Sequence, residues 1–374
     1  MSVPAPHRKL RTVVCGTKFG RIYLAAFRNK AIPFELVGIV GQGSDRSHAC
    51  ANAYKVPLYR SAKELPDDIE AACVVVGAGI NGGKGCELAL ELMSRGIHVL
   101  QEHPLHHDEL GTCLRAARRY GVHYHLNTHY RHIAPIRRFV AAVRALRGKQ
   151  APLFVEAASG IQVLYTLLDL LGEALGGLHP WSVGSALSAT DRPFAVVHTT
   201  MAGVPVTLRV QNELNPSDPD NYAHLLHHVM IGTEGGTMTL VSTHGPIIWT
   251  PRAHLPDDAK IGPYMENSSA DHLDEASATI LDPSTPPTYR TILSGVWPNG
   301  VERALREFHR SLVNNEDVLL RGQYYLTLCK LWQGVTAQLG YPTLASIDVP
   351  NVLSAEPMRQ AIAVSDTETT EVIK

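Results

Sequence analysis

The sequence predicts an α/β protein of two domains: an N-terminal domain built on a parallel, doubly wound sheet, and a C-terminal α+β domain built on an open-faced, mainly antiparallel sheet. Over residues 1–126, short apolar runs alternate with segments of helical periodicity, which is typical of a parallel sheet covered by helices. From residue 127 onward, longer runs alternate apolar and polar residues, as expected of an antiparallel sheet with one covered face. A chain of 374 residues is long enough for both domains.

The apolar pattern sets the expected elements of the first domain. Strands are expected at residues 12–15, 34–40, 72–76 and 97–100. Helices are expected at residues 21–27 and 86–94, and a third begins at Asp108, a good N-cap residue, and ends at Gly121. Because helical crossovers separate the strands, we expect parallel pairing throughout this domain.

The second domain is expected to span residues 127–350, and Pro135 opens its first helix. The apolar face of that helix is formed by Ile136, Phe139, Val140, Val143 and Leu146. Alternating strands are expected at residues 204–210, 238–240 and 247–249, and late helices at residues 301–313 and 324–339. Residues 215–221 and 251–263 are rich in proline and aspartate and are predicted loops. Residues 351–374 form a polar tail.

The composition excludes several classes of partner. The net charge is −1, so neither a nucleic acid nor an anionic membrane is expected to bind. No apolar run approaches the roughly 18 residues that span a bilayer, and residues 1–11 lack the apolar segment of a secretory signal. The six cysteines form no Cys-x-x-Cys pair, which favours reduced thiols in a cytoplasmic protein.

A glycine-containing turn follows the first expected strand and precedes the first expected helix. Its spacing, Gly16-x-x-x-Gly20, is a degenerate form of the Gly-x-Gly-x-x-Gly motif. Glycines let the backbone approach a pyrophosphate, and the helix N-terminus offers free N–H groups. We expect the turn to bind a dinucleotide through Gly16, Thr17, Lys18, Phe19 and Gly20. An ordinary strand-to-helix turn has the same pattern and stays open as the alternative.

The end of the second strand bears on which dinucleotide is bound. NAD sites usually carry an acidic residue there, which accepts hydrogen bonds from the ribose hydroxyls. This strand ends at Gly41, and the expected cofactor-binding residues Gly43, Ser44 and Arg46 follow it. A hydroxyl and a guanidinium suit a dianionic 2′-phosphate, so we predict NADPH rather than NADH. Asp45 lies among these residues, and a solvated loop is the alternative interpretation.

Further motifs connect these features with a known family. They are Val74-Val75-Val76-Gly77, Gln101-Glu102-His103-Pro104, Asn-Thr-His-Tyr-Arg at residues 127–131 and Gly-Thr-Glu-Gly-Gly at residues 232–236. Together with the glycine turn, they resemble the glucose–fructose oxidoreductase and inositol dehydrogenase family over about residues 10–340. The resemblance implies a Rossmann domain, an open-faced sheet that pairs in a homodimer, and cofactor contacts from Gly77, Glu102 and His103.

Within that family, the chain is most similar to the thiazolinyl imine reductases of siderophore biosynthesis. The similarity rests on Gly-Thr-Lys-Phe-Gly at residues 16–20, Gly-Gln-Gly-Ser-Asp-Arg-Ser at residues 41–47 and Glu-His-Pro-Leu-His-His at residues 102–107. It implies that NADPH reduces a thiazoline C=N bond to a thiazolidine. The implied substrate is attached to a carrier protein of a nonribosomal peptide synthetase.

The sequence departs from the sugar-oxidising branch of the family at two positions. That branch has lysine where this chain has His103, and it has a histidine three residues before an aspartate on a helix that corresponds to residues 160–171. Here Thr166 precedes Asp169 at that spacing. Removing a hydroxyl proton needs a base at that place, so a sugar or cyclitol dehydrogenase is the less favoured alternative. We expect Asp169 to pair with a buried arginine or to be a helix-face charge rather than a catalytic group.

Imine reduction needs a proton at nitrogen as well as a hydride at carbon. His103 suits the role of acid because imidazole titrates near neutral pH. Tyr130 is the other expected donor, the choice between the two stays open, and a surface or packing role is the alternative for each. A non-catalytic NADP-binding sensor is a further alternative. His123, His125 and His129 suggest a metal site, but no His-Glu-x-x-His motif or cysteine pair accompanies them, so we expect no metal.

Overall fold

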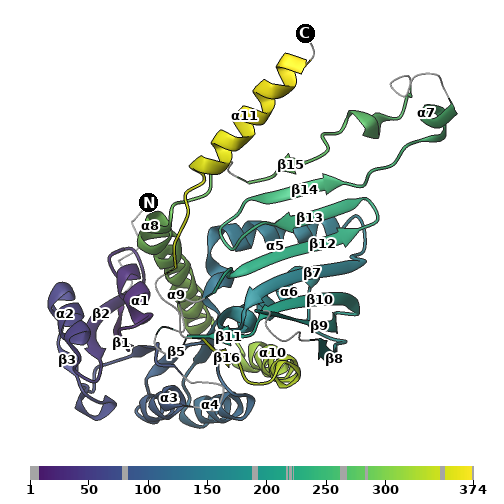
Figure 1. Ribbon diagram of the computed structural model, residues 1–374. Helices are drawn as coiled ribbons and strands as arrows, with labels where there is room; N and C mark the ends of the chain where they lie inside the picture. Colours follow the sequence, from purple (N-terminus) through teal and green to yellow (C-terminus); the bar gives the residue numbers. More distant parts are fainter. Residues whose placement is uncertain are drawn as a thin grey trace, which may run out of the picture.

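The computed structural model describes residues 8–372 apart from 78–82, 188–192, 216–217, 219–220, 222, 262–267, 283–284 and 346–349. Two sheets dominate it: a six-stranded sheet in the N-terminal part and an eight-stranded sheet in the later part of the chain (Figure 1). The first sheet is parallel throughout. The second is antiparallel except where β10 pairs with β7. The predicted fold class is confirmed.

The first sheet has the strand order β3-β2-β1-β4-β5-β6. Its strands are β1 (Leu10–Cys15), β2 (Phe34–Val40), β3 (Leu58–Tyr59), β4 (Ala71–Val74), β5 (His98–Glu102) and β6 (Tyr124–Asn127). The connecting helices are α1 (Gly20–Ala26), α2 (Asp45–Tyr54), η1 (Ala62–Glu64), α3 (Lys84–Ser94) and α4 (His107–Tyr120). The chain leaves β1 in one direction and continues from β4 in the other. Ligands of such sheets bind at the carboxyl ends of the strands beside this divergence.

Helix α4 begins one residue before the expected Asp108, and its N-cap is His106. The His106 imidazole accepts a hydrogen bond from the Asp108 N–H at 3.4 Å, and Glu109 Oε2 accepts one from the His106 N–H at 3.4 Å. This reciprocal pair satisfies N–H groups that the helix itself leaves free, so the N-cap prediction was wrong by two residues. The expected end is confirmed, because Gly121 takes a left-handed φ of 67°.

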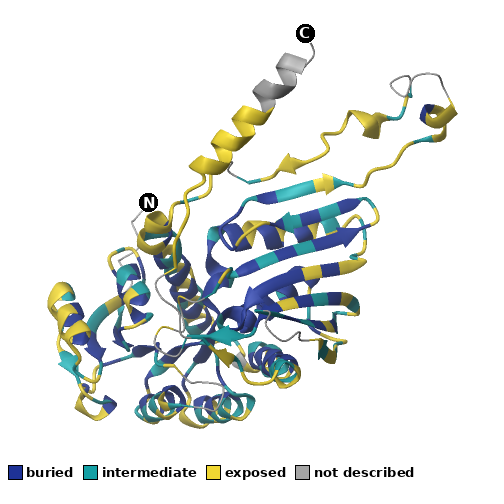
Figure 2. Ribbon diagram, in the orientation of Figure 1, coloured by how far each residue is buried: buried dark blue, intermediate teal, exposed yellow. Residues whose placement is uncertain are grey.

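The second sheet has the strand order β15-β14-β13-β12-β7-β10-β9-β8. Its strands are β7 (Phe154–Gly160), β8 (Ser182–Leu187), β9 (Phe194–Met201), β10 (Val204–Gln211), β12 (His227–Thr233), β13 (Gly236–Leu240), β14 (Ile247–Pro251) and β15 (Thr279–Ile280). A separate short pair joins β11 (Glu213–Leu214) to β16 (Thr343–Leu344). Helices α5 (Ala134–Arg147) and α6 (Leu164–Leu175) lie behind this sheet in Figure 1, and no described helix covers its front face. That face carries many of the partly exposed strand residues in Figure 2.

The helix expected at residues 160–171 begins later than predicted. Gly160 is the last residue of β7, and η3 (Ile161–Val163) makes one turn before α6 starts at Leu164. Nearly every residue of α6 is buried, because α5, α10 and the sheet all pack against it. A helix that is apolar on all sides is expected in such a place.

Two late helices, α9 (Trp297–Val313) and α10 (Val318–Leu339), join the domains. Helix α9 follows α8 (Tyr289–Thr291) and the π-helical turn η6 (Ile292–Val296), and it packs against α1. Phe308 stacks on Phe34 with 6.1 Å between ring centroids, and Leu305 lies in the same apolar cluster. Helix α10 packs against α4 and α6. Residues far apart in the sequence therefore complete the core of the N-terminal domain.

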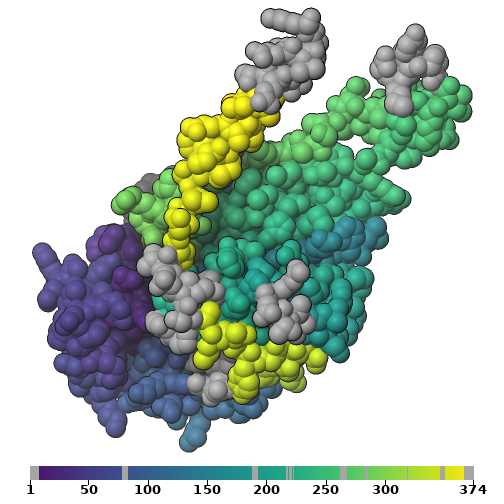
Figure 3. Space-filling view, viewed as in Figure 1, coloured from purple at the N-terminus to yellow at the C-terminus, as the bar shows by residue number. Residues whose placement is uncertain are grey.

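Two segments project from the body of the molecule (Figures 1 and 3). One is the connection between β14 and β15, which contains α7 (Asp257–Ile261) where a loop was expected, and η5 (Asp271–Asp274). The other is α11 (Glu356–Val372), a helix within the expected tail, preceded by the exposed side chains of Val352 and Leu353. None of the described helices is long and apolar enough to cross a bilayer.

Candidate active site

Glu102 ends β5 at the carboxyl edge of the parallel sheet, and its side chain is buried. The Tyr23 hydroxyl donates a hydrogen bond to Glu102 Oε2, and Asn127 Nδ2 donates another at 2.9 Å. Burial alone would raise the pKa of Glu102, but the His103 imidazole and the donated hydrogen bonds lower it below its ordinary value. Glu102 is therefore a fixed carboxylate at neutral pH.

His103 follows Glu102 directly and is oriented by it. Its Nδ1 lies 2.6 Å from Glu102 Oε1 and 3.3 Å from the Asn127 carbonyl oxygen. The ring stacks on Tyr165, with 5.6 Å between centroids and 14° between the ring planes. Within the described part of the chain, Nε2 has no hydrogen-bond partner. The arrangement thus holds one nitrogen and leaves the other for a ligand.

Tyr130 lies in η2 (His129–His132), just after the end of β6, and is buried. Three aromatic rings surround it in edge-on contacts. The centroid distances are 4.9 Å to His227, 5.3 Å to His129 and 5.9 Å to Trp297. Tyr130 and His103 therefore follow the ends of the adjacent strands β6 and β5. A second histidine, which the sequence reasoning missed, packs on the Tyr130 ring.

That histidine, His227, starts β12 and is held as a neutral ring by two threonines. The Thr166 hydroxyl donates its one proton to the Val163 carbonyl at 2.8 Å. Its oxygen therefore accepts a hydrogen bond from His227 Nε2–H at 2.9 Å. Thr243 Oγ1 accepts the His227 backbone N–H at 3.0 Å, which leaves its own proton for His227 Nδ1 at 3.1 Å. Burial is the main cause that lowers the pKa of His227 to about 3. An imidazole thus lies beside Thr166, but it is too weak a base to take a proton from an alcohol at neutral pH.

Several buried polar atoms at the carboxyl ends of β5 and β6 have no partner among the described residues. They are Gln101 Nε2, Asn127 Oδ1 and both ring nitrogens of His129. Burial lowers the pKa of His129 to about 4, so its ring is neutral. Leaving such groups unpaired costs roughly 1–3 kcal/mol each. A ligand with hydrogen-bonding groups of its own, such as the nicotinamide end of a dinucleotide, fits this place.

The glycine turn after β1 has the geometry that a phosphate-binding loop needs. Gly16 has a left-handed φ of 96°, and a Cβ there would lie 2.5 Å from the Val75 carbonyl oxygen, so only glycine fits. Helix α1 starts at Gly20, and Lys18 is exposed beside it. Phe19 also packs inside the site, because its ring lies 5.3 Å from the His129 ring and 6.0 Å from the Trp297 ring, measured between centroids.

The loop after β2 gathers hydroxyl groups and a guanidinium. Ser44 caps α2, and its Oγ lies 3.0 Å from Ser47 Oγ. Ser47 Oγ in turn lies 3.2 Å from Thr17 Oγ1. Arg46 is exposed in the first turn of α2, and Gly43 has a left-handed φ of 77°.

A second arginine reaches this loop. Arg60 NH1 donates to the Gln42 carbonyl at 2.8 Å, and its guanidinium lies across Gly43, where a Cβ would collide with it. The sequence reasoning missed Arg60, which follows the two-residue strand β3 beside β2.

Gly77 and Asp169 are two further residues considered from the sequence, and their surroundings differ from those of His103 and Tyr130. Gly77 is exposed, no atom lies within 4 Å of the place where its Cβ would be, and it precedes the segment 78–82 that is not described. Asp169 is buried and accepts hydrogen bonds from the hydroxyls of Thr128 and, at 2.8 Å, Tyr324, while Arg131 lies 3.9 Å away. Arg131 is half-buried and lies closer to Glu173, at 2.7 Å, so Asp169 is the second carboxylate beside this arginine.

The histidines that suggested a metal site are held apart by other contacts. His125 Nε2 lies 3.0 Å from Ser311 Oγ, and its Nδ1 lies 3.2 Å from the Arg321 guanidinium. The His123 ring packs edge-on against His98. Across the described ranges, no three His, Cys, Asp or Glu side chains are grouped to hold a metal ion.

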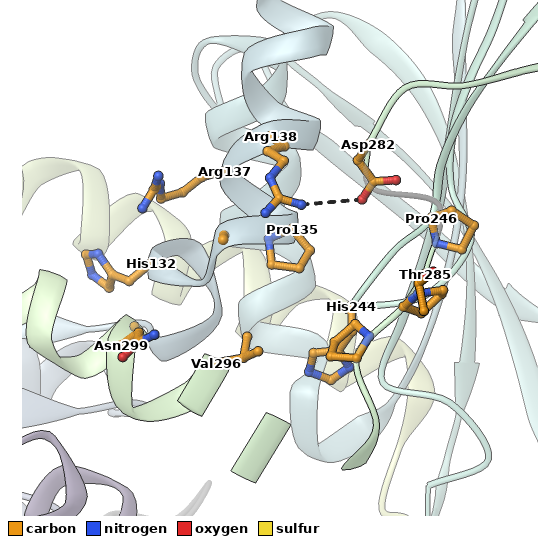
Figure 4. A pocket seen from close by; sticks show the side chains of 14 residues that line it. His132, Pro135, Arg137, Arg138, His244, Pro246, Asp282, Thr285, Val296 and Asn299 are labelled. Carbon is orange, nitrogen blue, oxygen red and sulfur yellow. Dashed lines mark ion pairs between the residues drawn. The ribbon is translucent and has the colours of Figure 1, made fainter. Parts of the chain in front are cut away.

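A cavity of about 250 Å³ opens between α5, the start of α9 and the segment before β14 (Figure 4). Arg137 and Arg138 line one side of it, and His244 lies on the other side. His244 Nε2 accepts a hydrogen bond from Trp297 Nε1 at 3.0 Å. Because Trp297 packs on Tyr130, one layer of side chains separates the cavity from the candidate proton donor.

Comparisons with known proteins agree with this architecture. Residues 10–128 match the model of an oxidoreductase family with an NAD-binding Rossmann fold. The fold and the site thus define an NAD(P)-dependent oxidoreductase. Residues 150–250 match the model of the C-terminal domain of Irp3-like thiazolinyl imine reductases. No curated protein sequence matches the chain.

Solved structures share the fold at low sequence identity. A 3-ketoreductase from Actinomadura kijaniata in complex with NADP has a TM-score of 0.64 at 16% identity, over 91% of this chain and 100% of that one. An oxidoreductase from Agrobacterium radiobacter in complex with NAD+, L-tartaric acid and magnesium has a TM-score of 0.62 at 12% identity, over 87% and 94%. A putative myo-inositol dehydrogenase from Sinorhizobium meliloti has a TM-score of 0.58 at 12% identity, over 87% and 95%.

Proposed function

We propose that the protein is an NADPH-dependent reductase that converts a thiazoline C=N bond into a thiazolidine on a carrier-protein-bound intermediate of siderophore biosynthesis. The observation that carries the proposal is the match of residues 150–250 to Irp3-like thiazolinyl imine reductases. The chemistry of the site agrees with it. The position of the motif lysine holds His103, and the imidazole beside Thr166 is a neutral, hydrogen-bonded ring rather than a base.

His103 is the first proposed proton donor. NADPH supplies the hydride when it is bound. The Glu102 carboxylate fixes His103 through Nδ1, so a proton leaves from Nε2, the nitrogen without a partner in the described structure. A protonated imine accepts a hydride far better than a neutral one, and a positioned acid contributes roughly 10²–10⁴-fold to such a step.

Tyr130 is the second proposed donor, through its phenol or a water that it orders. Its neighbours His129 and His227 are uncharged at neutral pH, since burial lowers their pKa to about 4 and about 3. They therefore shape the Tyr130 pocket without delivering protons. His103 and Tyr130 remain the two titratable groups suited to the reaction.

The cofactor is proposed to be NADPH rather than NADH. Its pyrophosphate would lie at the turn of residues 16–20, and its 2′-phosphate at the loop after β2. The support is the absence of a carboxylate at Gly41, together with the hydroxyl of Ser44 and the guanidinium groups of Arg46 and Arg60. Glu102, His103 and Gly77 would face its nicotinamide half.

We also propose a homodimer in the cytoplasm. The face of the eight-stranded sheet without a described helix offers a pairing surface (Figure 1). The six cysteines are free and buried, which suits a reducing compartment.

The test mixes the protein with NADPH and a synthetic thiazoline and measures the loss of NADPH absorbance. His103→Ala and Tyr130→Phe are each expected to lower turnover at least tenfold while the Kd for NADPH stays within about twofold of wild type. Full activity in both variants would remove them as donors. Robust oxidation of a polyol by the wild-type protein would overturn the imine reductase proposal in favour of a cyclitol or sugar dehydrogenase. NADPH binding without reduction of free or carrier-bound thiazoline would favour a cofactor sensor.

A further inference from the structure

A cluster of arginines lies on the surface between α5 and α9. We call it the arginine face; it consists of Arg137, Arg138, Arg303, Arg306 and Arg310, all exposed. Four of the five line one shallow groove, and Arg138 lies on the adjoining cavity together with Arg137. The net charge of the whole chain is −1, so this concentration of positive charge is local.

The carboxylates near the arginine face leave it positively charged. Glu307 lies 3.3 Å from the His132 ring and 3.7 Å from Arg310, and Glu302 accepts a hydrogen bond from Asn29 at 2.5 Å. Asp282 is buried beside Arg138 at 3.7 Å. The other members of the face have no carboxylate within 4.0 Å among the described residues; they are Arg137, Arg303 and Arg306.

The guanidinium groups of the arginine face also repel one another. Burial lowers the pKa of the Arg137 guanidinium, and the positive charges of Arg303 and Arg138 lower it further. Arg137, Arg303 and Arg306 repel one another without a carboxylate within 4.0 Å in the described structure, and an anionic partner reduces this repulsion.

Two members of the arginine face, Arg137 and Arg138, also line the cavity in Figure 4. His244 and Gly300 also line this cavity. His244 bonds Trp297, and a Cβ on Gly300 would lie 3.3 Å from His129 Cε1. Whatever binds at the arginine face is therefore held next to the residues that enclose Tyr130.

We propose that the arginine face docks an acidic carrier protein and that the anchor of its substrate-bearing arm lies at the adjoining cavity. The inference rests on the proposed function, which requires a tethered substrate. The arm of such a carrier is anchored through a phosphodiester, and the guanidinium groups of Arg137 and Arg138, which line the cavity, suit that anion. Arg303 and Arg306 lie further along α9, where they meet the carrier surface around the anchor.

The experiment compares two substrates with the same reacting ring. One is a thiazoline thioester on a peptidyl carrier domain of a siderophore synthetase, and the other is the same thioester on N-acetylcysteamine. The test variant is Arg303→Glu/Arg306→Glu. The matched control is Arg118→Glu/Arg119→Glu, which makes the same charge change at exposed positions of α4.

The test variant is expected to raise KM for the carrier-bound substrate about tenfold or more, with KM and kcat for the N-acetylcysteamine thioester unchanged within about twofold. Added salt should raise the wild-type KM for the carrier-bound substrate alone. Equal kinetics of test variant and wild type on the carrier-bound substrate would overturn the proposal, and so would the same rise in the control variant.

Docking is also measured without turnover, by fluorescence anisotropy of a labelled carrier domain bearing its phosphopantetheine arm. Loss of this binding in the test variant supports the docking site even if neither thioester is reduced, an outcome that would refute the proposed function alone. Tighter binding of a labelled RNA duplex than of the carrier domain would overturn the proposal in favour of a nucleic-acid surface.

Discussion

Replacing Arg60 by methionine is the sharpest test of cofactor choice. The guanidinium lies across Gly43 and donates to the Gln42 carbonyl at 2.8 Å, at the loop where a 2′-phosphate would bind. A charge-assisted hydrogen bond contributes about 1.5–3 kcal/mol. Arg60 is exposed, so solvent screening places its contribution near the lower limit, about 1.5 kcal/mol. We therefore expect Arg60→Met to weaken NADPH binding about tenfold.

The assay is titration of the protein with NADPH and with NADH, monitored by nicotinamide fluorescence. NADH lacks the 2′-phosphate, so its Kd should be the same in Arg60→Met and wild type. Arg46→Met tests the other proposed phosphate ligand in the same way, because Arg46 is exposed and makes no hydrogen bond to the loop within the described structure. A parallel loss of both cofactors would show that Arg60 only supports the loop, and an unchanged NADPH affinity would refute the assignment.

Two further predictions concern buried charge. His129 and His227 have pKa values of about 4 and about 3 in the folded protein. In the unfolded chain these histidines bind a proton near the ordinary pKa of about 6.5. As the pH is lowered below about 6.5, each ring should therefore decrease the free energy of unfolding by about 1 kcal/mol per pH unit. Urea unfolding at several pH values measures this, and a slope that His227→Gln does not reduce would contradict it. Asp169→Asn should lower the free energy of unfolding by about 2 kcal/mol, since it weakens hydrogen bonds to a buried carboxylate, while NADPH affinity is unchanged. If thermal and urea unfolding match wild type but turnover is lost, Asp169 acts in the reaction instead.

Local patterns were sufficient for the strand that leads to Glu102 and His103, because apolar runs bounded by turns are a property of consecutive residues. They were not sufficient for contacts made across the fold. His227 meets Thr166 because β12 pairs with β7, which places His227 opposite Ser159. Arg60 follows a strand of only two residues, too short to give a periodic signal, and it reaches Gln42 because β3 pairs with β2.

The N-cap of α4 was misplaced for a related reason. Asp108 is the stronger N-cap residue by type, but the reciprocal bonds between His106 and Glu109 determine where the helix begins. A histidine cap is a weak sequence signal. Residue type alone therefore predicted the helix and its glycine end but not its first turn.

The packing of α9 on the parallel sheet has a consequence for how the protein is made. When residues 1–126 leave the ribosome, the apolar surface around Phe34 still lacks Leu305 and Phe308, which are synthesised much later. The nascent N-terminal domain therefore stays partly uncovered until α9 has been synthesised, and chaperones can bind it in that interval. For the same reason, a chimaera of two such enzymes that is joined once near residue 126 would combine a sheet from one parent with a covering helix from the other. A viable exchange would transfer residues 297–313 together with the sheet that they cover.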